Sequence, residues 1–149
     1  MNGSIAKYFK ANPESPDGVS TFQLYLMRLL FLLNFVALGL SVWPGIINHE
    51  GTWDPMHGIA TSCWAALSVL SGIGIRYPLK MLTLLIMQLI YKSVWVLAVG
   101  LSLKSAGPLD PVAAALFSVC AKGLVVDLIV IPWPYVFANY VKKSGDRWR

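Results

Sequence analysis

Four long runs of apolar residues, separated by short polar stretches, set the pattern of this chain. They cover residues 22–43, 58–75, 81–103 and 112–131. Each run is close to the ~20 residues that an α-helix needs to cross the hydrocarbon core of a bilayer. The pattern therefore predicts an all-α polytopic membrane protein, with four transmembrane helices in an up-down bundle of two helical hairpins.

The ends of the apolar runs carry residues that start or stop helices. The first helix is expected to end at "WPG", residues 43–45. The second and fourth runs follow the similar segments "WDPM" and "LDPV". Asp54 and Asp110 are suited to capping the first-turn amides, and Pro55 and Pro111 suit the first helical position, where a missing N–H costs nothing.

The chain is expected to have three parts. Residues 1–21 form a polar cytoplasmic tail, residues 22–137 a four-helix transmembrane domain, and residues 138–149 a basic cytoplasmic tail. The C-terminal segment "IPWPYVFANYVKKSGDRWR" indicates a short interfacial helix with a basic end that is attracted to anionic lipid.

Composition agrees with a membrane protein. Of the 149 residues, 56% are hydrophobic and only 13% are charged, whereas soluble domains are about 25% charged. The net charge of +5 does not indicate a nucleic-acid partner, because the cations fall on one side of the expected topology. That side holds Lys7, Lys10, Arg76, Lys80, Lys142, Lys143, Arg147 and Arg149, and the other side holds only Lys104. Both termini are therefore expected in the cytoplasm.

Two charges inside the apolar runs are expected to meet. With a rise of about 1.5 Å per residue, Lys92 lies roughly 16 Å above the cytoplasmic face, and Asp127 lies within reach of its flexible side chain. An ionisable group at the bilayer centre costs roughly 3 kcal/mol on insertion scales. Pairing offsets that cost, so the sequence predicts a Lys92–Asp127 pair that faces the interior of the bundle.

A wider polar cluster is expected around this pair. Lys122 is too deep to reach the headgroups easily and needs an acceptor, whereas Arg28 can extend to the cytoplasmic surface. Such a cluster could hold an anionic or carbonyl-bearing lipophile or carry protons. Alternatively, the pair is a structural clamp, or its members pair across a subunit interface. The candidate residues are Gln88, Lys92, Lys122 and Asp127, with Arg28, Asn34, Tyr91 and Trp95.

Small residues are expected to hold the helices together, because lipid is as apolar as leucine and gives no hydrophobic drive for association. One stripe consists of Thr61, Ala65, Ser68 and Gly72, and another of Ala114, Ala115, Ser118 and Gly123. The serines have no histidine at their depth to act as a base. No catalytic residue is therefore predicted.

The outer loop "NHEGTWDPMH" contains His49, Glu50 and His57. These are weak candidates for a metal site, because their spacing matches no established ligand pattern and Asp54 is needed as a helix cap. No metal is predicted, and the sequence leaves open which cofactor, if any, the protein uses. Cys63 and Cys120 are expected to be small buried side chains, and the sequence leaves open whether they are neighbours.

At "IRYPLKMLTLLIMQLIYKSVWVLAV" and "GLVVDLIVIPWPYVFANYVKK" the chain resembles small bacterial four-helix integral membrane proteins of no assigned activity. In outline it is similar to the DoxX-like bundles. The resemblance extends over the four spans as a pattern of length, helix number and a short "RYPLK" hairpin. It implies a location in the bacterial inner membrane and carries no functional residues across.

The function expected from these features is that of a non-enzymatic membrane protein, which forms a homo-oligomer or serves as an accessory subunit among membrane lipids. One alternative is a small ion, proton or anion carrier or channel that uses the intramembrane polar cluster. A second alternative is a lipophile-binding protein or membrane-embedded enzyme.

Overall fold

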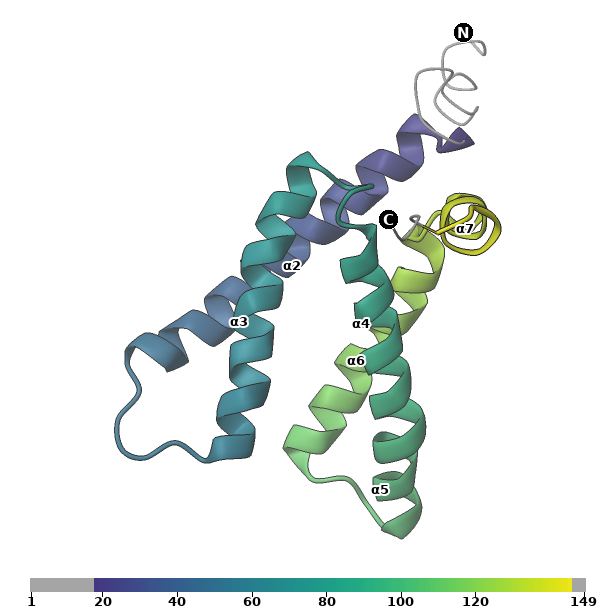
Figure 1. Cartoon of the computed structure of the whole chain (residues 1–149). Helices are drawn as coiled ribbons and strands as arrows, with labels where there is room; N and C mark the ends of the chain where they lie inside the picture. Colours follow the sequence, from purple (N-terminus) through teal and green to yellow (C-terminus); the bar gives the residue numbers. More distant parts are fainter. Residues whose placement is uncertain (1–17, 146–149) are drawn as a thin grey trace, which may run out of the picture. The chain divides into compact units, whose positions relative to one another are not determined.

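The chain is an all-α membrane protein with four candidate spans (Figure 1). The computed structural model describes residues 18–145, which contain no β-strand. The spans are α2 (Thr21–Ile47), α3 (Pro55–Arg76), a continuous helical segment at Leu82–Ala106, and α6 (Pro111–Val130). The predicted fold class is confirmed. Four cations of the predicted topology lie outside the described residues, namely Lys7, Lys10, Arg147 and Arg149.

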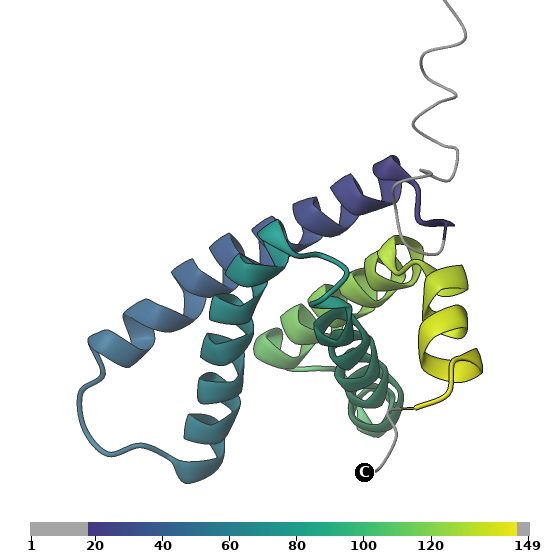
Figure 2. The ribbon, with the colours of Figure 1, turned by 45° about the horizontal axis from the view of Figure 1, so that its top comes forward.

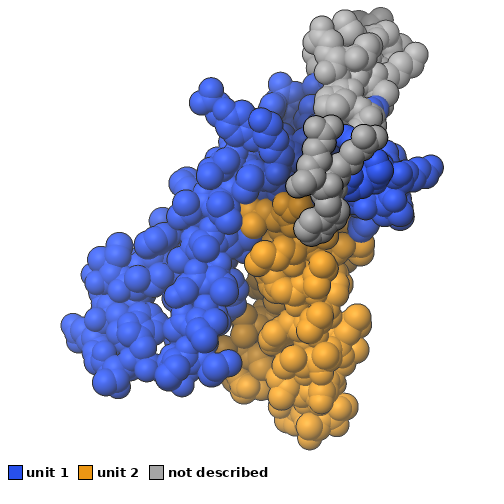
Figure 3. Space-filling model, in the orientation of Figure 1, with its two compact units in different colours: residues 1–82, 132–149 blue, residues 83–131 orange. Residues whose placement is uncertain are grey.

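The described chain forms two compact units (Figure 3). The first contains α2, α3 and the C-terminal helical segment, and the second covers Thr83–Ile131 with most of the third span and all of the fourth. Each unit therefore contains one pair of apolar helices that follow one another in the chain.

Aspartate side chains start two of the spans, as predicted. Asp54 Oδ2 accepts a hydrogen bond from the backbone N–H of His57 at 2.7 Å. Asp110 Oδ1 accepts from the N–H groups of Val112 and Ala113 at 2.9 and 3.0 Å. The proline after each aspartate is the first residue of its helix, where it sacrifices no hydrogen bond.

The first span does not end at "WPG", and that prediction is wrong. Helix α2 continues through Pro44 to Ile47. Pro44 has no N–H to donate, but its carbonyl still accepts from the N–H of Asn48 at 3.0 Å. A proline one turn before the end removes a single helical hydrogen bond, and in this position it does not terminate the helix.

The third span changes its winding in the middle. It consists of α4 (Leu82–Val94), the π-helix η2 (Trp95–Gly100) and α5 (Leu101–Ala106). The N–H of Leu101 donates to the carbonyl of Val96, five residues earlier, where an α-helix would use four. Apolar periodicity alone did not predict this segment. Such π turns are uncommon and often lie at functional sites.

In the first unit, α2 and α3 lie against each other (Figure 2). Large side chains of α2 contact glycines of α3. A Cβ added to Gly74 would lie 2.5 Å from the ring of Phe31, and one added to Gly72 would lie 3.1 Å from the ring of Phe35. The hydroxyl of Ser68 donates to the Phe35 carbonyl at 3.2 Å. The predicted stripe on the second span is therefore confirmed, and its other two members, Thr61 and Ala65, are also buried.

The C-terminal segment begins at a break in the helix. Ile131 has an extended backbone, with ψ of 123°, and two short helical stretches follow. They are α7 (Trp133–Val136) and the π-helix η3 (Phe137–Lys142), which run on as one piece. The predicted interruption at Pro132 and the short helix after it are confirmed.

The first prediction concerns the contact between Phe31 and Gly74. The Gly74→Ala variant should lower the free energy of unfolding by about 1–3 kcal/mol, because a new methyl group in a filled contact forces the helices apart. Unfolding in detergent, followed by circular dichroism, measures the change. The matched control is Gly45→Ala, since a Cβ at Gly45 meets nothing within 4 Å. Equal stability of the two variants would contradict the packing described here.

Candidate functional site

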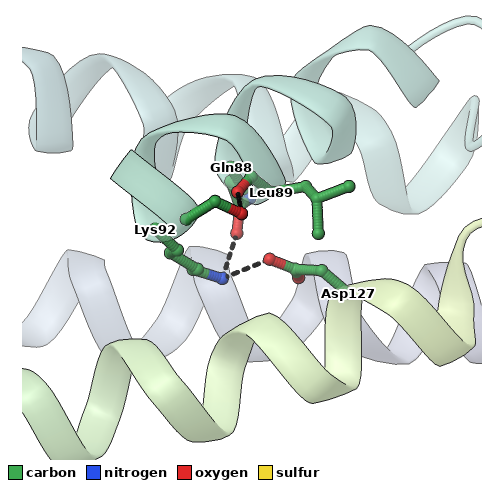
Figure 4. A network of polar contacts seen from close by, with 5 residues as sticks. Gln88, Leu89, Lys92 and Asp127 are labelled. Atoms are coloured by element: carbon green, nitrogen blue, oxygen red, sulfur yellow. Dashed lines mark hydrogen bonds and ion pairs between the residues drawn. The ribbon is translucent and has the colours of Figure 1, made fainter. Parts of the chain in front are cut away.

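The second unit contains a buried ion pair between its two spans (Figure 4). The Nζ of Lys92, on α4, lies 2.7 Å from the Oδ2 of Asp127, on α6. The same ammonium donates a hydrogen bond to the Oε1 of Gln88 at 3.0 Å. The pairing expected from depth alone is present, and Gln88 belongs to it.

All three side chains are enclosed. The exposed fractions are 0% for Asp127, 1% for Gln88 and 8% for Lys92. A buried charge is tolerated when it is paired and hydrogen-bonded, and here one carboxylate oxygen and the ammonium satisfy each other. The second carboxylate oxygen, Oδ1 of Asp127, has no hydrogen-bond partner within the described chain.

Helical spacing explains how two residues of α4 and two residues of α6 meet at one contact. Gln88 and Lys92 are four apart on α4, and Gly123 and Asp127 are four apart on α6, so each pair shares a helix face. A Cβ on Gly123 would lie 3.1 Å from Nζ and 3.2 Å from Cε of Lys92. The missing side chain of Gly123 therefore makes the space in which the lysine lies.

The π-helix follows directly on this site and affects which residues face α6. Gly100 is buried, and a Cβ there would lie 2.5 Å from the ring of Phe117 on α6. In a regular α-helix Lys92 and Gly100 would point about 80° apart. The wider i→i+5 turn takes up extra residues and brings Gly100 back toward the side on which Lys92 meets α6.

The other candidates take different positions. Tyr91 is half-buried, with its ring centroid 6.0 Å from the Lys92 ammonium. Trp95 is half-buried and opens the π-helix. Arg28 and Asn34 lie on α2 in the first unit, where Arg28 is 5.5 Å from the ring of Tyr25.

Lys122 does not join the pair. It precedes Gly123 on α6, about 100° around the helix, and its side chain is exposed. Nothing within residues 18–145 forms a hydrogen bond or ion pair with it in this structure. The expectation that Lys122 lines an enclosed cluster with Lys92 and Asp127 is therefore not met.

The small-residue stripe expected on α6 is also only partly used. Ala114 and Ala115 are exposed and Ser118 is half-buried. Gly123 does receive a side chain in close contact, and this side chain is the charged Lys92. The ion pair and the Phe117–Gly100 contact therefore both belong to the contact face of α6.

The outer loop does not assemble metal ligands. Among residues 18–145 no three His, Cys, Asp or Glu side chains gather as a metal ion requires. Instead, His49 stacks on Trp53 with centroids 3.6 Å apart, and His57 lies 6.3 Å from the same ring. Cys63 and Cys120 are free thiols, but Cys63 is exposed and Cys120 is half-buried, so the expectation that both are buried is wrong.

Two features of the site were missed from the sequence. Gly123 was expected only as part of a helix contact, and the π-helix after Lys92 was not expected at all. The first had a signal, since Gly123 precedes Asp127 by one turn. The arrangement as a whole holds two helices in one register, and its charges are enclosed.

The second prediction is a double-mutant cycle on the pair. Lys92→Leu and Asp127→Leu should each lower the free energy of unfolding by about 3–5 kcal/mol, because each leaves one buried charge without its partner. The double variant should lie within about 1 kcal/mol of the native protein, since packed apolar groups can replace a buried pair. Detergent unfolding provides the measurement, with the exposed Lys104→Leu as control. Additive losses would show that the two groups act independently.

The third prediction concerns the space left by Gly123. Gly123→Ala should cost about 1 kcal/mol in the native protein, because the ammonium must shift away from Asp127. The same change should be neutral or stabilising in the Lys92→Ala, Asp127→Ala background, where nothing charged occupies the space and alanine favours a helix. Unfolding of all four proteins tests this, and an identical cost in both backgrounds would exclude the proposed role of Gly123.

No protein-family model, curated protein or solved structure matches this chain.

Proposed function

We propose that this protein is a non-enzymatic accessory subunit, which binds a different membrane protein through the face of α6 that carries Lys122. The observation that carries the proposal is the exposure of Lys122 at the middle of an apolar helix. It lies about 16 Å along the helix from Pro111 and about 12 Å from Val130. Its side chain also tilts toward the distant N-terminal end of the helix.

An exposed ammonium at that depth needs an anion. Leaving a lysine at the bilayer centre costs about 3 kcal/mol on insertion scales. Its neighbours on the same face, Val119 and Val126, are exposed apolar residues. A charged centre within an apolar face suits a protein helix that offers a carboxylate at the same depth.

The partner is proposed to be a different protein because this chain has no unpaired carboxylate inside a span. Of its seven acidic residues, Asp127 is the one that lies within a span and away from the helix ends. Asp127 already forms an ion pair with Lys92. Asp54 and Asp110 cap helix starts. A second copy therefore offers Lys122 no accessible carboxylate in the membrane, which argues for an accessory subunit over a homo-oligomer.

The alternative functions have less support. A carrier or an enzyme needs an ionisable group that water or a substrate reaches, whereas Asp127 is fully buried and bound to Lys92. The remaining oxygen of Asp127 and the adjacent π-helix are the features that favour a proton site. The direct ion pair at 2.7 Å supports a structural clamp instead.

The proposal includes an orientation. Among the described residues, the α3–α4 turn and the C-terminal segment carry Arg76, Lys80, Lys142 and Lys143, and the opposite helix ends carry Lys104. Short segments rich in lysine and arginine remain in the cytoplasm. We place both termini there, in a bacterial inner membrane.

The fourth prediction tests the α6 face by photo-crosslinking in native membranes. A crosslinker at Val119 should capture a different polypeptide whose crosslinked span contains Asp or Glu. Capture should fall about tenfold in Lys122→Leu and persist in Lys122→Arg, because the charge forms the contact. Exchanging the charges, with Lys122→Asp and a lysine at the partner's acid, should restore it.

A crosslinker at the exposed Ile90 of α4 is the matched control and should not capture that partner. A product of twice the chain mass would indicate a homo-oligomer and overturn the proposal. Equal capture with and without Lys122 would also overturn it.

A further inference from the structure

The first unit contains a basic groove beside the turn between α3 and α4. Its volume is about 440 Å³, within the range of small-molecule sites. Three cations line it, Arg28, Arg76 and Lys80, together with Tyr77 and Tyr135. Leucine and proline side chains complete the wall.

The charged residues that line the groove within the described part of the chain are all cations. Its described lining contains no Asp or Glu, so the cations are not neutralised within the first unit's groove. Arg76 and Lys80 both lie 5.4 Å from the ring centroid of Tyr77. One aromatic ring therefore holds two cations in place before any ligand arrives.

The backbone fixes these side chains close together. Arg76 is the last residue of α3, and the N–H of Met81 donates to the carbonyl of Tyr77 at 3.1 Å, which closes the turn that carries Lys80. Pro78, inside this turn, is buried. The C-terminus of α3 contributes about half a negative charge, which three full positive charges outweigh.

We propose that this groove binds a phosphate group, carried by an anionic phospholipid. Arginine forks match phosphate oxygens in pairs, and lysine adds a point charge. Tyrosines are enriched at the level of the lipid headgroups, and basic pockets between transmembrane helices take up anionic headgroups. The apolar part of the wall suits an acyl chain better than a free ion.

This site is independent of the α6 face. None of its lining residues belongs to the second unit, and its ligand is a small anion rather than a protein. Loss of lipid binding would therefore leave the proposed partner contact intact, and the reverse also holds.

The fifth prediction compares two ligands on the full-length protein by native mass spectrometry. In one arm the protein is titrated with phosphatidylglycerol, with phosphatidylcholine as the zwitterionic reference. In the other arm it is titrated with inorganic phosphate. Phosphatidylglycerol should bind at least about tenfold more tightly than phosphatidylcholine.

Variants locate the binding. Arg28→Gln, Arg76→Gln and Lys80→Gln together should reduce phosphatidylglycerol binding about tenfold or more. The control variant, Lys104→Gln, removes an exposed cation of the second unit, outside the groove, and should change binding less than about threefold. The pair Arg76→Gln and Lys80→Gln, both at exposed positions, repeats the test with less risk to folding.

The two arms identify the source of the phosphate. Groove-dependent binding of phosphatidylglycerol supports the lipid headgroup, and groove-dependent binding of inorganic phosphate alone supports the phosphate site with a free anion as its ligand. The proposal fails if neither probe depends on the groove residues, or if the control variant loses as much binding as the groove variant.

Discussion

One carboxylate shares the interior of the four spans with three cations, and this imbalance constrains the whole molecule. Each unpaired charge in hydrocarbon costs roughly 3 kcal/mol. Lys92 takes the carboxylate of Asp127. Arg28 lines the groove at the α3–α4 turn, and Lys122 remains exposed on α6. The proposed partner and the proposed lipid site both follow from the two cations that Asp127 does not neutralise.

The ion pair contributes to the register of the helices more than to net stability. A buried pair often stabilises no better than packed apolar groups, but a misplaced one leaves two uncompensated charges. Sliding α4 by one turn along α6 would move the ammonium about 5.4 Å, away from both Asp127 and the space at Gly123. The two unpaired charges would make this shifted packing unfavourable, whereas a purely apolar contact would tolerate the same shift.

Helix caps and the depth of charged residues in the membrane were predictable from the sequence. The direction in which a side chain points around its helix was not. The caps at Asp54 and Asp110 could be predicted because each involves only two or three neighbouring residues. The Lys92–Asp127 pair could be predicted from the helical rise per residue and from the small number of acids in the spans. Lys122 lies at a similar depth, but its direction depends on how α6 packs. The groove combines Arg28, the α3–α4 turn and Tyr135, which are too far apart in sequence for a local pattern to connect.

The shapes of the two sites also explain which cation each one uses. At the enclosed site, the Nζ, Cε and Cδ atoms of Lys92 all lie 3.1–3.4 Å from where a Cβ of Gly123 would stand. A slender chain with a compact ammonium fits this narrow space, whereas a planar guanidinium is broader. The groove has a volume of about 440 Å³, and two of its three cations are arginines, Arg28 and Arg76. The enclosed site therefore holds its own chain's carboxylate, and the open one has room for an anion from outside.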